Sequence, residues 1–194
     1  ALSGGVTTDD IFDMVKKLRE KTEIPLVFMT YLNPVFHYGY EAFFERCQDV
    51  GIDGIIIPDL PFEEKEEVDV VASRYGIDLI SMIAPTSKER IRKIAKGAKG
   101  FLYVVSSMGV TGERTNITTD IGGMLKEIRS VSSVPAAVGF GIHTPDQAAE
   151  ISKTADGVIV GSAVVKLIEK YGSHAGGHLY TYVRMMKETV SHSE

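Results

Sequence analysis

The chain has 194 residues, 44% of them hydrophobic and 24% charged, a composition typical of one globular domain with a full core. Its formal net charge of −5, without a cluster of lysine and arginine, argues against a nucleic-acid partner. A single cysteine, Cys47, excludes a disulfide framework, and no apolar run approaches the ~20 residues of a membrane span. We therefore expect a cytoplasmic protein, a single domain over residues 1–194, with Cys47 as a buried structural thiol.

Short apolar runs alternate with amphipathic patterns along the chain. The runs are apolar on both faces, which indicates buried parallel strands, whereas the stretches around them have the spacing of helices. The predicted strands cover residues 25–31, 54–57, 79–83, 101–105, 136–138 and 158–160. The predicted helices cover residues 8–20, 40–50, 63–75, 88–96, 121–130, 145–154, 163–170 and 178–190. Left-handed helix exits are expected at Gly51, Gly76, Gly97 and Gly157.

Alternation of this kind predicts an α/β fold, and its regular spacing favours a (β/α)8 TIM barrel over an open doubly wound sheet. A closed barrel of this type needs eight strands, and only about six are visible here. The sequence also opens on a helix pattern, with no strand before it. We therefore expect an incomplete TIM barrel, with about six of the eight strand–helix units present and the first two lacking.

Two of the predicted strands end in glycine directly before a helix. Gly141 follows the run at 136–138, and Gly161 with Ser162 follows the run at 158–160. Backbone N–H groups at adjacent strand ends beside helix starts form a cradle for a dianionic phosphate, and in a (β/α)8 barrel such a cradle follows the seventh and eighth strands. A single glycine would be explained by a tight turn, but the pair favours a phosphate-ester substrate held by the backbone. The polar loop 106–119 is predicted to be a lid or a disordered segment.

The other polar candidates are less specific. Asp59 at the end of the strand 54–57 either faces the site or caps the helix that begins near Glu63, and the sequence leaves both open. His174 and His178 are four residues apart, but glycines between them are expected to break the helix on which such a pair would chelate a metal. No metal site is predicted.

Six sequence blocks, in a matching order and at matching separations, resemble the alpha subunit of tryptophan synthase. The blocks are Tyr31-Leu32-Asn33-Pro34-Val35, Pro58-Asp59-Leu60-Pro61-Phe62-Glu63-Glu64, Ala84-Pro85-Thr86, Gly109-Val110-Thr111-Gly112, Gly139-Phe140-Gly141 and Gly161-Ser162-Ala163. The resemblance implies a (β/α)8-barrel lyase of tryptophan biosynthesis that cleaves indole-3-glycerol phosphate to indole and glyceraldehyde 3-phosphate. It further implies a beta-chain partner in an α2β2 complex and no metal or organic cofactor in this subunit.

The same resemblance assigns roles to individual residues. It places Tyr103, Thr111, Gly112, Gly141, Gly161 and Ser162 around the phosphate. It places contacts near the indole site and the subunit interface at Tyr31 and Asn33, which end the first of the predicted strands. We expect the substrate pocket to include Tyr31, Asp59 and Ile83, where Asp59 is chosen for its place at a strand end and Ile83 fits both the core and the pocket wall. The family's catalytic glutamate and aspartate have no counterpart here and are expected to lie before Ala1, so this chain by itself is expected to be inactive.

Two alternative functions remain open at this point. The first is another phosphate-binding TIM-barrel enzyme, of the ribulose-phosphate epimerase or phosphoribosylanthranilate isomerase type. Metal-ligating histidines at strand ends would favour the epimerase, and the sequence has none at those places. The second is a non-catalytic fragment that only docks on a beta subunit. Activity of the chain separates this last alternative from a working lyase.

Overall fold

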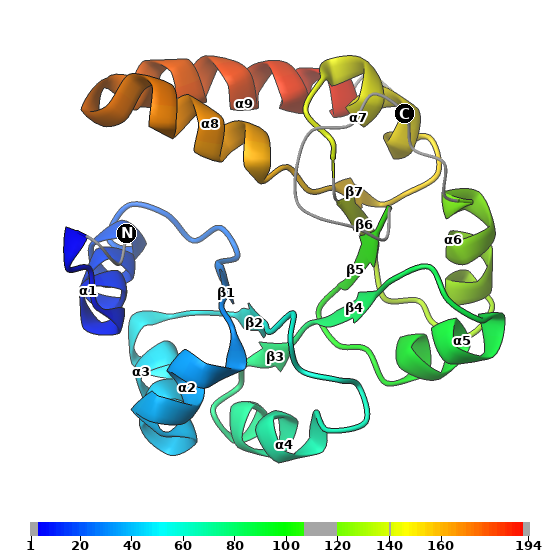
Figure 1. Cartoon of the computed structure of the whole chain (residues 1–194), viewed down its shortest axis with the longest axis horizontal. Coiled ribbons are helices and arrows are strands. Elements are labelled where there is room, and N and C mark those ends of the chain that lie inside the picture. The colour runs from blue at the N-terminus through cyan, green and yellow to red at the C-terminus, as the bar shows by residue number, and fades with distance from the viewer. Residues whose placement is uncertain (1–3, 107–119, 140, 192–194) are drawn as a thin grey trace. The chain divides into compact units, whose positions relative to one another are not determined.

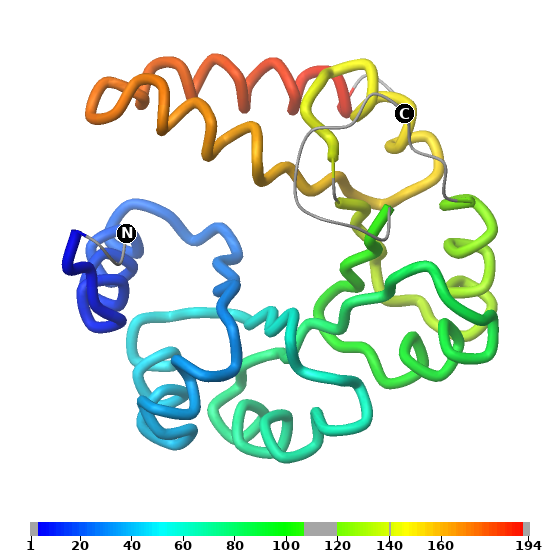
Figure 2. Tube along the Cα trace, in the orientation of Figure 1, coloured from blue at the N-terminus to red at the C-terminus, as the bar shows by residue number. Residues whose placement is uncertain are grey.

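A computed structural model describes residues 4–106, 120–139 and 141–191 (Figure 1). Its helices are α1 (Thr8–Arg19), α2 (Leu32–Tyr38), α3 (Tyr40–Val50), α4 (Glu66–Arg74), α5 (Lys88–Lys96), α6 (Ile121–Arg129), α7 (Pro145–Ser152), α8 (Ser162–Tyr171), the 3-10 helix η2 (Gly172–His174) and α9 (Ala175–Ser191). Its strands are β1 (Val27–Met29), β2 (Gly54–Ile56), β3 (Asp78–Leu79), β4 (Ser81–Ile83), β5 (Leu102–Val105), β6 (Ala136–Gly139) and β7 (Gly157–Val158). The alternation of strands with helices can be followed along the trace in Figure 2.

Contacts within the chain divide it into two compact units, residues 1–81 and residues 82–194. The first unit contains a sheet in the order β1-β2-β3, and the second contains a sheet in the order β4-β5-β6-β7. The α/β class predicted from the sequence is confirmed in both units. The single domain expected over residues 1–194 stays a prediction.

In the first unit, aromatic side chains fill the space between the sheet and its helices. β1 pairs with β2 and β2 with β3, in parallel. The ring centroid of Phe12 on α1 lies 5.6 Å from that of Phe28 and 5.5 Å from that of Phe43, distances at which edge-to-face packing adds to the burial of apolar area. Cys47 on α3 is fully buried in the same cluster, so the predicted burial of this thiol is confirmed.

In the second unit, β5, β6 and β7 are parallel neighbours, with Val105 opposite Gly139 and Val138 opposite Val158. Ion pairs connect helices α5 and α6. Glu127 on α6, only 8% exposed, accepts from Lys88 Nζ at 3.1 Å and Arg92 Nη2 at 2.5 Å, both on α5. Ion pairs at such a seam fix one helix against the next.

The same polar contact recurs at the amino end of each sheet. Asp53 donates its N–H to the carbonyl of Leu26 at 2.9 Å and accepts the Leu26 N–H on its carboxylate at 2.7 Å. Asp156 makes the matching pair of bonds with Ala136, at 3.0 and 2.9 Å. An arginine contacts each carboxylate: Arg19, the last residue of α1, at 2.6 Å and Arg129, the last residue of α6, at 3.4 Å. We call these groups the Arg19 clamp and the Arg129 clamp.

Most predicted elements are confirmed within one to three residues, and the capping signals explain why. Thr7 and Thr144 form capping boxes with Asp10 and Gln147, and the Ser87 side chain accepts from Arg90 N. The run 79–83 is divided at Ile80 into the end of β3 and the start of β4. Left-handed exits are confirmed at Gly51 and Gly76, with φ of +80° and +71°.

Four local predictions are wrong. Gly97 has φ of −102°, and Gly157 is the first residue of β7 instead of a helix exit. The extended segment through Asn33 is in fact helix α2. Pro34 fits there because its position in the first turn needs no backbone donor. Gly176 and Gly177 lie inside α9 and do not break it. His174 is in η2, and the ring of His178 stacks on Tyr171 at 3.6 Å between centroids.

Candidate functional site

The candidate site lies in the second unit, where β5, β6 and β7 reach their carboxyl ends. Backbone bonds continue to these ends, since Ser106 N donates to the Gly139 carbonyl at 3.0 Å and Ile159 N to the Val138 carbonyl at 2.8 Å. The chain segments that follow the three strands therefore start from one edge of the sheet. In parallel α/β sheets this carboxyl edge is where ligands bind.

The turn after β6, residues 141–144, has a defined shape. Gly141 has φ of +82°, a conformation that L side chains rarely adopt, so glycine is required there. The His143 ring donates Nδ1–H to the Gly141 carbonyl at 2.9 Å, because a carbonyl oxygen can only accept. The side-chain oxygen of Gln147 accepts the N–H groups of His143 and Thr144 at 3.0 and 3.2 Å. We call residues 141–144 the glycine turn.

After β7 the chain enters α8 at Gly161 and Ser162. Gly161 is the N-cap residue, and no side chain caps this helix end. None of the hydrogen bonds described for residues 4–106, 120–139 and 141–191 is donated by the N–H of Gly141, Gly161 or Ser162. Unengaged N–H groups at a helix start, together with the helix dipole, favour an anion.

Tyr103 on β5 packs tightly over the end of β6. Its side chain is 5% exposed, and burial raises the pKa of the phenol, so the hydroxyl stays protonated at neutral pH. A Cβ atom on Gly139 would lie only 2.5 Å from Tyr103 Oη and 2.7 Å from Cζ. Gly139 is therefore the residue that allows the tyrosine ring to cross β6 at this edge.

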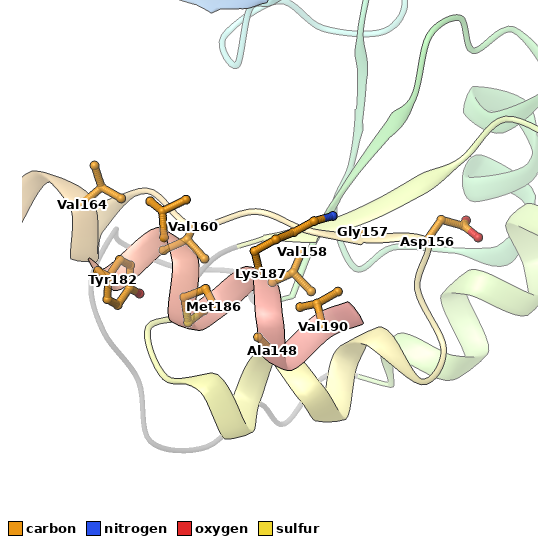
Figure 3. A pocket seen from close by; sticks show the side chains of 11 residues that line it. Ala148, Asp156, Gly157, Val158, Val160, Val164, Tyr182, Met186, Lys187 and Val190 are labelled. Carbon is orange, nitrogen blue, oxygen red and sulfur yellow. The ribbon is translucent and has the colours of Figure 1, made fainter. Parts of the chain in front are cut away.

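A second concave feature of this unit was not predicted from the sequence. A hollow of about 410 Å³ is lined mainly by apolar side chains of β7, α7, α8 and α9 (Figure 3). Its lining residues are Ala148, Asp156, Gly157, Val158, Val160, Val164, Tyr182, Val183, Met186, Lys187 and Val190. Of the predicted phosphate residues that the structure describes, Tyr103, Gly141, Gly161 and Ser162, none is among these lining residues. Alternating strand and helix patterns do not reveal such a hollow, because it depends on where α9 packs.

The remaining predicted residues are distributed over both units. Thr111 and Gly112, with most of the predicted lid, lie outside the described residues. Ile83 is fully buried in β4. Asp59 accepts the N–H of Leu32 at 2.9 Å and so caps α2, whereas the helix that follows it begins only at Glu66 and has no side-chain cap. Tyr31 is 66% exposed and is the N-cap residue of α2 instead of a strand end.

Within the described residues, no group of three or more histidine, cysteine, aspartate or glutamate side chains is arranged to hold a metal ion. Burial raises the pKa of the Cys47 thiol to about 12, so Cys47 is not a thiolate at neutral pH. The helices of the described segments are too short or too polar to cross a membrane.

Parallel strands joined by helices, with glycine turns at the carboxyl edge, define an α/β protein of the (β/α)8-barrel class, and solved structures agree. The chain has a TM-score of 0.88 and 33% identity to a structure from the tryptophan synthase α2β2 complex of Pyrococcus furiosus, covering 97% of this chain and 77% of that one. It has a TM-score of 0.85 and 34% identity to the tryptophan synthase alpha chain of Legionella pneumophila, covering 98% and 72%.

Sequence comparison then identifies the family. The profile of the tryptophan synthase alpha chain matches residues 1–191. The alpha chain of Lacticaseibacillus casei is 47% identical over 190 residues, 98% of this chain and 71% of that protein. The alpha chain of Thermoanaerobacter pseudethanolicus is 49% identical over 192 residues, 98% of this chain and 73% of that protein. The chain belongs to the tryptophan synthase alpha chain family, a family of lyases. The resemblance found in the six blocks is confirmed over the epimerase and isomerase alternatives.

Proposed function

We propose that the second unit binds the phosphate group of indole-3-glycerol phosphate, the substrate of this family, in the cytoplasm. The observation that carries the proposal is the set of unengaged N–H groups at Gly141, Gly161 and Ser162, which follow two neighbouring parallel strands. Backbone donors suit this substrate because N–H groups that point at a dianion, together with the helix dipole, can bind it without a lysine. The side chain of Tyr103 on β5 would form one wall of the phosphate region.

Phosphate binding far from the bond that breaks is useful because it orients that bond. Three further substrate-pocket residues expected from the sequence, Ile83 in the second unit and Tyr31 and Asp59 in the first, stay predictions. The family's proton transfers need a glutamate and an aspartate, for which the resemblance gives no counterpart among these 194 residues. In this proposal the described residues bind and orient the substrate, and the tryptophan synthase beta chain is the protein partner.

The test is a titration of the uniformly 15N-labelled 194-residue polypeptide with glycerol 3-phosphate, with glycerol as the comparison ligand. We expect the amide signals of Gly141, Gly161 and Ser162 to shift with the phosphate ester and not with glycerol. Gly141→Val should abolish the shifts, because it removes a residue with φ of +82° from the turn.

Gly172→Val is the matched control. Gly172 also has positive φ, +52°, but it lies at the opposite end of α8 from Ser162. This variant carries comparable backbone strain and should keep the shifts. Absence of shifts in the unmodified chain, or their equal loss in both variants, would contradict the proposal.

A further inference from the structure

We infer that Tyr182 on α9 is a positioning residue for the glycine turn, an inference that rests on the phosphate site proposed above. The Tyr182 hydroxyl donates a hydrogen bond to the carbonyl oxygen of His143 at 2.9 Å, across 39 residues of sequence. His143 is in turn bonded through its ring to the carbonyl of Gly141. Two hydrogen bonds, both made by His143, therefore connect Tyr182 to Gly141 of the proposed phosphate cradle.

The other contacts of the glycine turn explain why this bond matters. Three of these contacts, the bonds from the His143 ring to the Gly141 carbonyl and from the His143 and Thr144 N–H groups to Gln147, join residues no more than four apart. Local bonds fix the shape of the turn but not its place relative to the rest of the unit. The Tyr182 bond connects the turn to α9, a 17-residue helix that packs on both α7 and α8.

Tyr182 borders the hollow and also contacts the glycine turn. Tyr182 is half-buried and lines the hollow beside β7, together with Met186, Val160 and other apolar side chains labelled in Figure 3. A half-buried ring has less rotamer freedom than an exposed one, so the hydrogen bond to His143 costs less side-chain entropy. Because α8 begins at Ser162 and α9 packs on α8, one helix pair links both halves of the proposed cradle.

This arrangement assigns Tyr182 a defined task. It would hold the Gly141 amide at a constant distance from the α8 amino end, so that both donate to one phosphate group. Preorganised donors bind an anion more tightly than donors that must be brought together on binding. Tyr182 itself need not touch the ligand.

The variant that tests this is Tyr182→Phe, which removes one oxygen atom and leaves the ring in the hollow. Tyr180→Phe is the matched control, since Tyr180 lies on the same helix and is 68% exposed. We expect Tyr182→Phe to weaken the affinity for glycerol 3-phosphate by about 2- to 10-fold, the effect of one neutral hydrogen bond, and Tyr180→Phe to leave it unchanged.

Amide hydrogen exchange provides the second readout. The N–H groups of His143 and Thr144 should exchange faster in Tyr182→Phe than in Tyr180→Phe, whereas amides in α6 should not differ. A merely structural role would shift the stability of the whole unit and all of its amides together. Unchanged affinity, or turn amides that exchange at the same rate in both variants, overturns the inference. If the unmodified chain binds no phosphate ester, the proposed function fails and the inference about phosphate fails with it, while the exchange result still decides whether Tyr182 fixes the turn.

Discussion

At the amino ends of β1 and β6 the backbone is tied down by charged side chains, whereas at the carboxyl ends of β6 and β7 the chain turns on glycine. In the Arg19 and Arg129 clamps, each aspartate accepts from both an arginine and a backbone N–H group. The opposite edge leaves the N–H groups of Gly141, Gly161 and Ser162 without a described partner. Contacts at the amino ends of the strands thus contribute to stability, whereas the carboxyl ends are available for ligand binding, as the barrel class predicts.

The two clamps also differ from each other. Arg19 is 19% exposed at its side chain and donates to the carbonyls of Gly51 and Ile24 as well as to Asp53. Arg129 is 53% exposed and donates to Asp156 and the Thr154 carbonyl. The same pattern of residues should therefore contribute more to stability in the first unit, because its arginine is less accessible to water and donates to one more carbonyl.

The largest expected effect concerns catalysis at the carboxyl edge. A polypeptide of the 194 residues should cleave indole-3-glycerol phosphate at a background rate, at least ~10²–10⁴-fold below a full-length family member, because the resemblance gives it no counterpart of the family's glutamate and aspartate. An indole-release assay with and without the beta chain measures this. Cleavage at a rate comparable to that of a full-length alpha chain would show that Asp59 or another carboxylate carries the chemistry.

The next effect is on stability at the amino edge. Arg19→Ala should lower the free energy of unfolding by about 1–3 kcal/mol, since it removes the Arg19 donors to the Gly51 and Ile24 carbonyls and leaves the Asp53 carboxylate with the Leu26 N–H as its described donor. Arg129→Ala, the matched variant in the second unit, should cost less than about 1 kcal/mol. Urea unfolding measures both. Equal losses would contradict the difference drawn between the two clamps, and a large change in phosphate affinity in either variant would contradict the separation of the two edges.

A third effect tests the close approach at the end of β6. Gly139→Ala should destabilise the second unit by about 1–3 kcal/mol, because the new Cβ would overlap the Tyr103 ring. The double variant Gly139→Ala with Tyr103→Leu should recover part of this loss relative to Tyr103→Leu alone. Tyr103→Phe should not, since Cζ also lies within 2.7 Å of the added atom. Additive losses in the double variant would show that the ring moves away freely.

The smallest effect is the pH dependence of the α5–α6 seam. The hydrogen bond from Lys88, followed by that from Arg92, lowers the pKa of Glu127 below its ordinary value of 4.5. A group with a lowered pKa in the folded state stabilises the fold above its unfolded pKa, and the stabilisation is lost as pH falls through the folded pKa. Below pH 4.5 the unmodified chain should therefore lose more stability than Glu127→Gln. If the unfolding midpoints of the unmodified chain and of Glu127→Gln change equally with pH across this range, the Glu127 ion pairs are not a source of acid sensitivity.

Sequence patterns predicted the elements better than the side-chain contacts. Helix bounds were accurate where a cap was present in the sequence, as at Thr7, Ser87 and Thr144. Helix α2 was missed because Asn33-Pro34 favours extended backbone locally, while the group that stabilises the helix start is the Asp59 carboxylate, 27 residues further along the chain. Such a cap is a tertiary contact and has no local signal.

For the candidate site, glycine before a helix was an informative signal at Gly141 and Gly161, since the backbone itself is the binding group. The contribution of Tyr182 could not be predicted in the same way. Its spacing in α9 is that of an ordinary half-buried aromatic residue, and its partner is a carbonyl oxygen 39 residues earlier. The hollow beside β7 has the same origin, because it forms where α9 packs and not from any one segment.

The burial of Cys47 has a practical consequence. As the one cysteine of the chain, with no exposed surface and a pKa of about 12, it can react with a thiol reagent only when the first unit opens. The rate of its modification in the native protein therefore measures how often residues 1–81 open. If this modification rate equals the rate of global unfolding, the two units open together; if it is faster, residues 1–81 open separately. The measurement needs no added label.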